Sequence, residues 1–186
     1  MKKLLLAVLV AGLLGLAAGN AMAATSTDSA NINLLVTPVV IVDLNVTPTY
    51  YNFGNIDLQT STMSLTALTL SNAGNVGFKI EKAVWANGAD WDITKSSTQT
   101  NGFDLWAMVN ASKPTLLSEF AAASAGFNEA GTGSDTYMNA LKDSGGVQVN
   151  MSPTQTQNMW FRLDMPKYVT KEAQQTIKVR LKATAN

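Results

Sequence analysis

Neither cysteine nor histidine occurs anywhere in this 186-residue chain. Without cysteine no disulfide can form, and both a thiol nucleophile and a thiolate zinc site are excluded. Without histidine the chain cannot build a Ser-His-Asp triad, a histidine metal site or a histidine acid–base catalyst. An enzyme made from this sequence would have to work with paired carboxylates or with serine and lysine. We therefore expect a protein that is not an enzyme and that holds no cofactor.

Long apolar runs are confined to the first residues, MKKLLLAVLVAGLLGLAAGNAMA. A lysine pair begins this stretch, an apolar run follows, and Ala21-Met22-Ala23 matches the small-x-small cleavage pattern of a secretory signal peptide. The run is short for a membrane anchor, and three glycines weaken it further. Cleavage after Ala23 would remove residues 1–23, leave no membrane span and export the rest to the periplasm, the cell surface or the extracellular space. Because no cysteine lies near this site, a lipid anchor there is excluded.

Charge is scarce, because only 14% of the residues are Asp, Glu, Lys or Arg. The chain has 13 basic and 13 acidic residues, and Lys2 and Lys3 belong to the expected leader. Residues 24–186 would then carry a net charge of about −2. This balance provides no electrostatic footprint for nucleic acid or for an anionic membrane surface. We expect neither as a partner.

Period-2 alternation of apolar and polar residues recurs through the remaining chain and predicts half-buried β-strands. Such runs occupy residues 68–70, 76–80, 91–93, 103–109, 147–151, 159–165 and 177–183. Turn-forming residues separate them, for example Asn72-Ala73-Gly74-Asn75. About eight or nine strands at this spacing indicate an all-β antiparallel sandwich. The exception is residues 114–136, where we expect one short helix within a long connection.

Two stretches resemble secreted bacterial Ig-like domains. The first runs from Tyr50 to Ile80, with a Phe53-Gly54 pair before the strand and an Asn-x-Gly-Asn turn at its end. The second is MWFRLDMP, residues 159–166, which is followed after a polar gap by the strand TIKVRLKA. Most proteins of this group have no characterised function. The resemblance implies a secreted bacterial protein with an Ig-like β-sandwich over residues 47–186, and it implies no activity.

The stretch before this region, NINLLVTPVVIVDLNVTP, is a long alternating strand interrupted by Pro38. Its apolar face consists of Ile32, Leu34, Val36, Val40, Val42 and Leu44. Proline cannot donate to a sheet ladder, so we expect a break there, with residues 32–36 on one sheet and 39–46 on the other. Val39 and Ile41 make the later half apolar on both faces, which predicts burial on both sides or cover by a partner.

Two interpretations of this N-terminal leading strand, residues 24–46, remain open. It is either the first strand of the chain's own sandwich or an arm donated to a neighbouring molecule. The proline break favours the first, because such a break allows one strand to pass from one sheet to the other. A chain that began at Val46 would then not fold as a monomer.

Two sets of residues are candidates for a binding site. The tryptophans could stack on a sugar, with Trp85 and Trp160 as the leading candidates, although core packing is the favoured interpretation of all four. Asp90 and Asp92 would share one face of a strand and could bind calcium or form a glycosidase-like pair. A polar edge beside the turn that precedes them is the favoured interpretation of these carboxylates.

The sequence as a whole predicts a non-catalytic, secreted structural or interaction protein of the cell surface. One form of this hypothesis is a self-assembling subunit that pairs strand edges with its own copies or with another surface protein. The alternative is a β-sandwich module that binds carbohydrate or another ligand.

Overall fold

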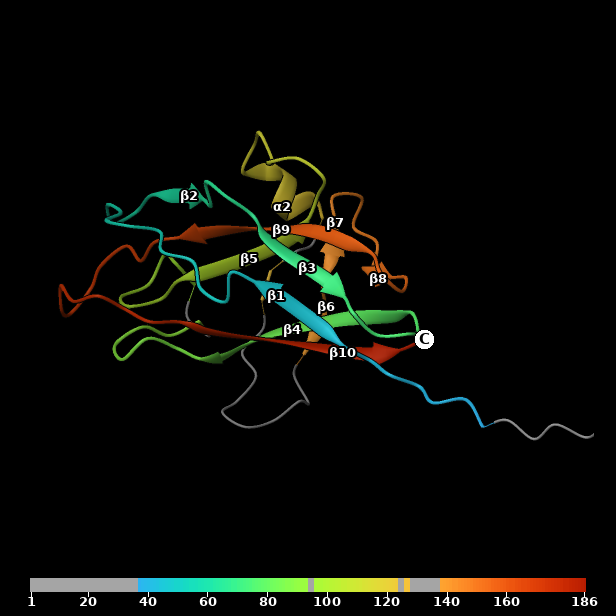
Figure 1. Cartoon of the computed structure of the whole chain (residues 1–186). Coiled ribbons are helices and arrows are strands. Elements are labelled where there is room, and N and C mark those ends of the chain that lie inside the picture. Colours follow the sequence, from blue (N-terminus) through green and yellow to red (C-terminus); the bar gives the residue numbers. More distant parts are fainter. Residues whose placement is uncertain (1–36, 94–95, 124–125, 128–137) are drawn as a thin grey trace, which may run out of the picture. The chain divides into compact units, whose positions relative to one another are not determined.

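The computed structural model describes residues 37–93, 96–123, 126–127 and 138–186 (Figure 1). The chain divides into two compact units, Met1–Pro38 and Val39–Asn186. Every strand and helix of the described residues lies in the second unit. None of the helices in this described part is long and apolar enough to cross a membrane.

The second unit is an all-β sandwich of two packed sheets, as the alternating pattern predicts. One sheet, called the β9 sheet, has the order β1 (Leu44–Thr47), β3 (Leu68–Asn72), β9 (Thr156–Asp164), β5 (Asp104–Val109) and β7 (Lys142–Asp143), with β2 (Ser61–Met63) also paired to β9. The other, called the β4 sheet, has the order β10 (Lys178–Ala185), β4 (Phe78–Ala86) and β6 (Asn139–Ala140), with β8 (Asn150–Met151) also paired to β4. The named pairs are antiparallel except for β5 with β7.

The core lies between the sheets, where alternate residues of each long strand point inward. On β5 this alternation is as predicted: Leu105, Ala107 and Val109 face the core, and Met108 packs on the opposite face. The largest fully buried apolar side chains of the core are Phe78, Phe103, Leu70, Ile80, Leu141, Met151, Met159 and Val84. The two sheets are therefore held together mainly by burial of aliphatic and aromatic side chains.

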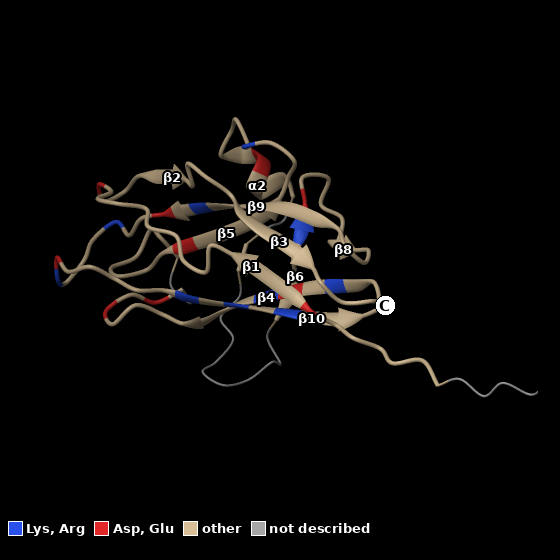
Figure 2. Cartoon of the chain, viewed as in Figure 1, with Lys and Arg blue, Asp and Glu red and all other residues tan. Residues whose placement is uncertain are grey.

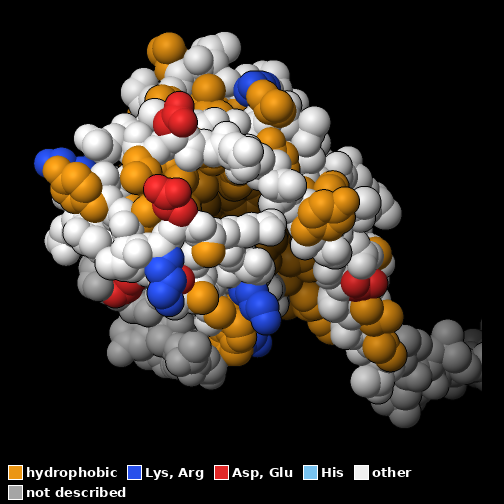
Figure 3. Space-filling view, turned by 90° about the vertical axis from the view of Figure 1, so that its left-hand side faces the viewer, with side chains coloured by type: hydrophobic (Ala, Val, Ile, Leu, Met, Phe, Trp, Pro, Cys, Tyr) orange, Lys and Arg blue, Asp and Glu red, His pale blue; other side chains and the backbone are white. Residues whose placement is uncertain are grey.

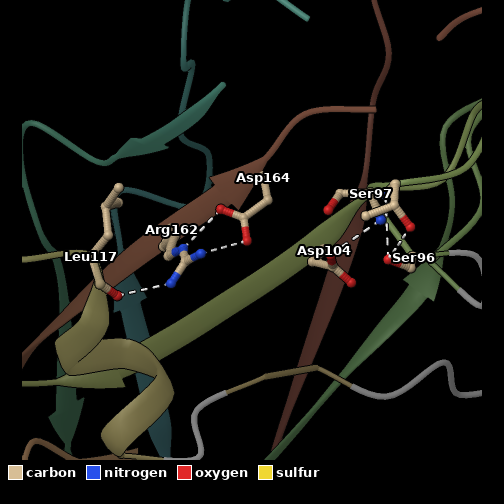
Figure 4. A network of polar contacts seen from close by, with 7 residues as sticks. Ser96, Ser97, Asp104, Leu117, Arg162 and Asp164 are labelled. Carbon is tan, nitrogen blue, oxygen red and sulfur yellow. Dashed lines mark hydrogen bonds and ion pairs between the residues drawn. The ribbon is translucent and has the colours of Figure 1, made fainter. Parts of the chain in front are cut away.

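A second, smaller cluster covers the outer face of the β9 sheet beneath α2 (Ser118–Ala122), which is the helix expected within residues 114–136 (Figure 1). It contains Met108, Phe120, Ala123 and Trp160. The Arg162 guanidinium next to it forms two 2.7 Å hydrogen bonds to Asp164 and one of 2.9 Å to the Leu117 carbonyl oxygen (Figure 4). These contacts attach the start of the helix to strand β9.

One side of the sandwich is closed by a short segment that passes from one sheet to the other. Residues 139–140 form β6 in the β4 sheet, and residues 142–143 form β7 in the β9 sheet. Leu141 lies at the crossing and is fully buried, and its N–H donates to the Ile80 carbonyl oxygen at 2.9 Å. This crossing seals the core along the edge formed by β6 and β7.

Three of the predicted strands are shorter than the sequence pattern indicates. The half of the leading strand expected at residues 39–46 is reduced to β1, Leu44–Thr47, because residues 39–43 pair with the 72–75 turn and not with a strand. The run at residues 91–93 contributes only an isolated bridge between Asp92 and Gly102. Asn101, just before this bridge, has a φ of 61°, and this left-handed conformation turns the chain away from an extended pairing. The run at 147–151 is reduced to the two residues of β8.

Candidate functional site

The described residues of the leading strand lie against the predicted turn at residues 72–75. The Ile41 N–H donates to the side chain of Asn75 at 2.8 Å, and the Asn75 N–H donates to the Ile41 carbonyl oxygen at 3.1 Å. The Asn75 side chain also donates to the Val39 carbonyl oxygen at 2.7 Å. Gly74 is needed beneath this crossing, because an added Cβ would collide with the Ile41 carbonyl oxygen. The turn is therefore both a chain reversal and a clamp for residues 39–43.

The side chains of this clamped segment are not buried in the domain. Val39, Val40, Ile41 and Val42 are 71%, 61%, 50% and 38% exposed. The prediction that the chain's own sandwich buries both faces of residues 39–42 is therefore wrong, because the clamp holds their backbone beyond the sheets. Burial begins at Leu44 and Val46, which pack against the core. The earlier candidates of this strand, Ile32, Leu34 and Val36, lie outside the described residues.

The side of the sandwich formed by β1 and β10 lacks the cover that the crossing at Leu141 gives the opposite side. Among the described residues, β1 is paired only with β3, and β10 only with β4, so each strand has one free edge. The inward side chains on both edge strands, among them Val46, Val179 and Leu181, are only partly buried. The core is consequently open to solvent along this side.

A large cleft occupies the opening, with a volume of about 1740 Å³. Its floor and walls are mostly apolar and include Leu44, Val46, Leu68, Phe161, Leu163, Val179 and Leu181. Figure 3 shows a deep hollow with hydrophobic walls on the face turned toward the viewer. Residues 49–58 and 171–177 also line it, and they lie where β1 ends and β10 begins. We call this the mouth end of the sandwich, and the opposite end, where the 72–75 turn holds residues 39–43, the leading end.

Basic side chains alternate with apolar side chains along β10. Lys178, Arg180 and Lys182 alternate with Val179 and Leu181 along the strand (Figure 2). Successive residues of a strand face opposite sides, so the charged row lies on the outer surface while the apolar row faces the core. The lining of the cleft nevertheless includes Lys178 and Arg180 beside Val179 and Leu181.

The two candidate carboxylates lie near the mouth of the cleft. Asp90 forms a 2.9 Å ion pair with Lys171, and its backbone N–H donates to the Gln175 side chain at 3.1 Å. The N–H of Asp92 donates to the Asn101 carbonyl oxygen at 2.9 Å. In the described part of the chain, no group of three or more acidic residues is placed to hold a metal ion. The Asp90 carboxylate therefore has a cationic partner. Its ion pair links the loop after β4 to the segment before β10 at the rim of the cleft.

The candidate tryptophans are placed differently from one another. Trp85 lines the cleft at a bulge in β4, and the Arg180 guanidinium lies 4.4 Å from the centre of its ring. Trp160 is only 8% exposed in the cluster beneath α2, where its indole N–H donates to the Asn110 carbonyl oxygen at 3.0 Å. Trp91 also lines the cleft and packs on Phe103. Trp85 is therefore the named stacking candidate that lies at the cleft.

A buried lysine on the closed side of the sandwich is a feature that we did not anticipate from the sequence. Lys82 is fully buried, and its ammonium donates to the Gly126 carbonyl oxygen at 2.8 Å and to the Asn139 side chain at 2.9 Å. It also lies 4.9 Å from the centre of the Phe127 ring. Burial, with a smaller contribution from Lys142, lowers the pKa of Lys82 from 10.5 to about 7. The sequence does carry a signal for this burial. Lys82 occupies the same face of β4 as the core residues 78, 80 and 84.

No protein-family model matches the chain, and no curated protein matches it either. The function is therefore inferred from the cleft and from the sequence alone.

Proposed function

We propose that the protein is an exported, non-catalytic structural subunit that self-assembles at the cell surface through the open side of its sandwich. The observation that carries this proposal is the apolar cleft between the free edges of β1 and β10. A free edge presents a row of unpaired backbone N–H and C=O groups, which is a template for another strand. A strand added there would pair with these groups and cover the apolar walls in one step.

The chemistry of the chain supports a role without catalysis. The sequence lacks the histidine and cysteine that most nucleophilic and acid–base sites use. Two of its carboxylates, those of Asp90 and Asp164, are engaged in ion pairs. The signal-like leader and the resemblance of residues 50–80 and 159–166 to secreted bacterial Ig-like domains support export from a bacterial cell.

The test is the assembly state of the purified full chain after export and leader removal. We expect its mass by light scattering to rise with concentration, and electron microscopy to show ordered particles larger than a monomer. A mass that stays monomeric at millimolar concentration, with no particles on the surface of producing cells, would contradict the proposal.

A second candidate function is carbohydrate binding in the same cleft. The observation that favours it is the placement of Trp85 and Trp91 on the cleft wall, because indole faces stack on sugar rings. A glycan array probed with the wild-type protein and with Trp85→Ala tests this function, and Trp160→Phe provides a control away from the cleft. Glycan binding that is lost only in Trp85→Ala would favour this candidate over assembly.

A further inference from the structure

The cleft requires an occupant that is extended, apolar on its buried face and free of charge. The walls come from both sheets, and either edge strand can accept a ladder of backbone hydrogen bonds. A charged side chain set against the apolar walls, away from the lining residues Lys171, Lys178 and Arg180, would lose its hydration without gaining a partner. These conditions exclude most polar segments of the sequence as occupants.

One stretch of the chain satisfies all three conditions. Residues 31–42, which we call the arm, read NINLLVTPVVIV and include no charged residue. Alternation places Ile32, Leu34 and Val36 on one face. The eight residues before the clamp, 31–38, span about 26 Å when extended, which is also the span of the eight residues of β10 at the same rise. The arm is therefore long enough to follow β10 over its whole length.

Pro38 is compatible with this role. A proline interrupts a ladder only on the side where its N–H would donate, and it is tolerated in an edge strand whose N–H at that position faces outward. A strand that enters the cleft pairs with one edge and leaves its other edge free. The proline thus restricts the arm to an edge position, which is the position that the cleft provides.

The same chain cannot place its arm in its own cleft in a favourable way. Asn75 holds residues 39 and 41 at the leading end, so the nearest point of reversal is Thr37-Pro38. A two-residue hairpin there would set Asn31 opposite Leu44 and Asp28 opposite Thr47. A longer loop would bring still earlier residues to β1, and the stretch 24–31 is mainly polar. The apolar part of the arm would then lie beside residues 39–43, outside the cleft.

From these observations, and resting on the self-assembly proposed above, we infer that the cleft is covered by the arm of a second copy. Residues 31–38 are inserted from the mouth end, and residues 39–42, which stay clamped to their own copy, lie at the mouth. The exposed residues 39–42 lie at the leading end, whereas the cleft opens at the mouth end. The contact is consequently head to tail, and each copy both gives an arm and receives one. A head-to-tail contact that does not close into a ring produces a filament.

The polarity of the inserted strand follows from this arrangement. The donor lies beyond the mouth of the acceptor, so Val42 stays near the mouth and Ile32 reaches toward the leading end. β10 runs from the mouth end to the leading end, and the arm therefore runs antiparallel to it. Ile32 is predicted to approach Ala183 rather than Val179.

Disulfide trapping tests the occupant and its polarity, because the natural chain has no cysteine that could interfere. Full-length protein carrying Ile32→Cys is mixed with isotope-labelled protein carrying Ala183→Cys, Val179→Cys or Lys79→Cys, and mixed dimers are counted by mass after mild oxidation. Lys79 is exposed on the outer surface of β4 and provides the background. We expect the mixed dimer with Ala183→Cys to exceed the other two several-fold.

The remaining outcomes overturn the inference in distinguishable ways. A monomeric disulfide in the double variant Ile32→Cys/Ala183→Cys would mean that each chain fills its own cleft. A higher yield with Val179→Cys would mean that the strand is inserted in the opposite direction. Oligomers without trapping above the Lys79→Cys background would leave the proposed function intact and refute the arm as the occupant. A protein that is monomeric throughout would refute both.

A pair of charge variants provides a second measurement that does not depend on oxidation. Val40→Asp with Val42→Asp places two carboxylates on the arm at positions that are exposed in the single copy, so folding is retained. We expect the concentration needed for assembly to rise at least about tenfold, because these carboxylates would be desolvated at the mouth of the cleft. The matched control is Asn45→Asp with Thr47→Asp, which adds two carboxylates at exposed positions on β1 outside the arm, and it should change that concentration by less than about twofold. Equal effects of the two would contradict the inference.

Discussion

The two sides of this sandwich differ in how the core between the sheets is covered. On one side the chain crosses between the sheets at Leu141, which is fully buried, and Lys82 links β4 to residues 126 and 139. On the other side β1 and β10 end the sheets without a crossing, and a cleft of about 1740 Å³ reaches the core. The closed side shows what the chain does when it covers its own core. The open side is where we propose that another molecule supplies the cover.

The largest difference between the two sides is expected when a leucine side chain is truncated on each of them. Leu141→Ala should lower the free energy of unfolding by about 2–5 kcal/mol, because a fully enclosed leucine leaves a cavity that cannot collapse. Leu181→Ala on β10 removes a leucine that is already partly exposed, and in the dilute monomer it should cost less than about 1.5 kcal/mol. Urea denaturation of both variants at low concentration measures the difference. Equal losses would mean that the two sides are equally enclosed.

The second prediction concerns the pH dependence that Lys82 gives to the closed side. Its pKa is about 7 in the folded protein and about 10.5 in the unfolded chain, so between these values the unfolded state binds the extra proton. Stability should therefore rise as the pH increases from 7 to 10, by roughly 3 kcal/mol or more for this group. Denaturation at several pH values, with Lys82→Met as the reference, isolates the effect. A wild-type protein whose pH profile parallels that of Lys82→Met would show that the lysine titrates normally.

The third prediction concerns the clamp that holds the leading strand on the open side. Gly74→Ala should destabilise the domain by about 1–3 kcal/mol, because the added methyl group meets the backbone of residues 41 and 43. Gly77→Ala is the matched control, since its nearest neighbour is the side chain of Asn186 at 3.3 Å, which can move aside. That control should stay within about 0.5 kcal/mol of the wild type. If both variants match the wild type in thermal unfolding, residues 39–43 are not fixed by the turn.

Much of the fold could be predicted from alternation, because the long strands bury one face and expose the other. The strands β5, β9 and β10 follow the expected pattern residue by residue. The crossing at Leu141 could not be predicted in this way, because β6 and β7 have two residues each and show no periodicity. Lys82 was visible as a lysine at an inward position, but the Gly126 and Asn139 oxygen atoms that receive it come from distant parts of the chain.

The candidate site was only partly predictable for a related reason. The apolar face of the leading strand can be read directly from the sequence, and the exposure of residues 39–42 contradicts burial by the chain's own sheets. The cleft itself depends on which strands end the two sheets, and that is a property of long-range pairing. Neither β1 nor β10 carries a local signal that its outer edge remains unpaired.

Completion of the sandwich by a strand from another copy can be measured by amide hydrogen exchange of β10 in the wild-type protein at low and at high concentration. The N–H groups on the outer edge of β10 should exchange quickly in the dilute monomer, because no other strand of the described residues lies along that edge. On assembly we predict strong protection of those N–H groups of residues 178–185 that point away from β4, and no change at Leu141 on the closed side. Assembly that leaves the exchange of β10 unchanged would contradict the claim that a strand from another copy completes the sandwich.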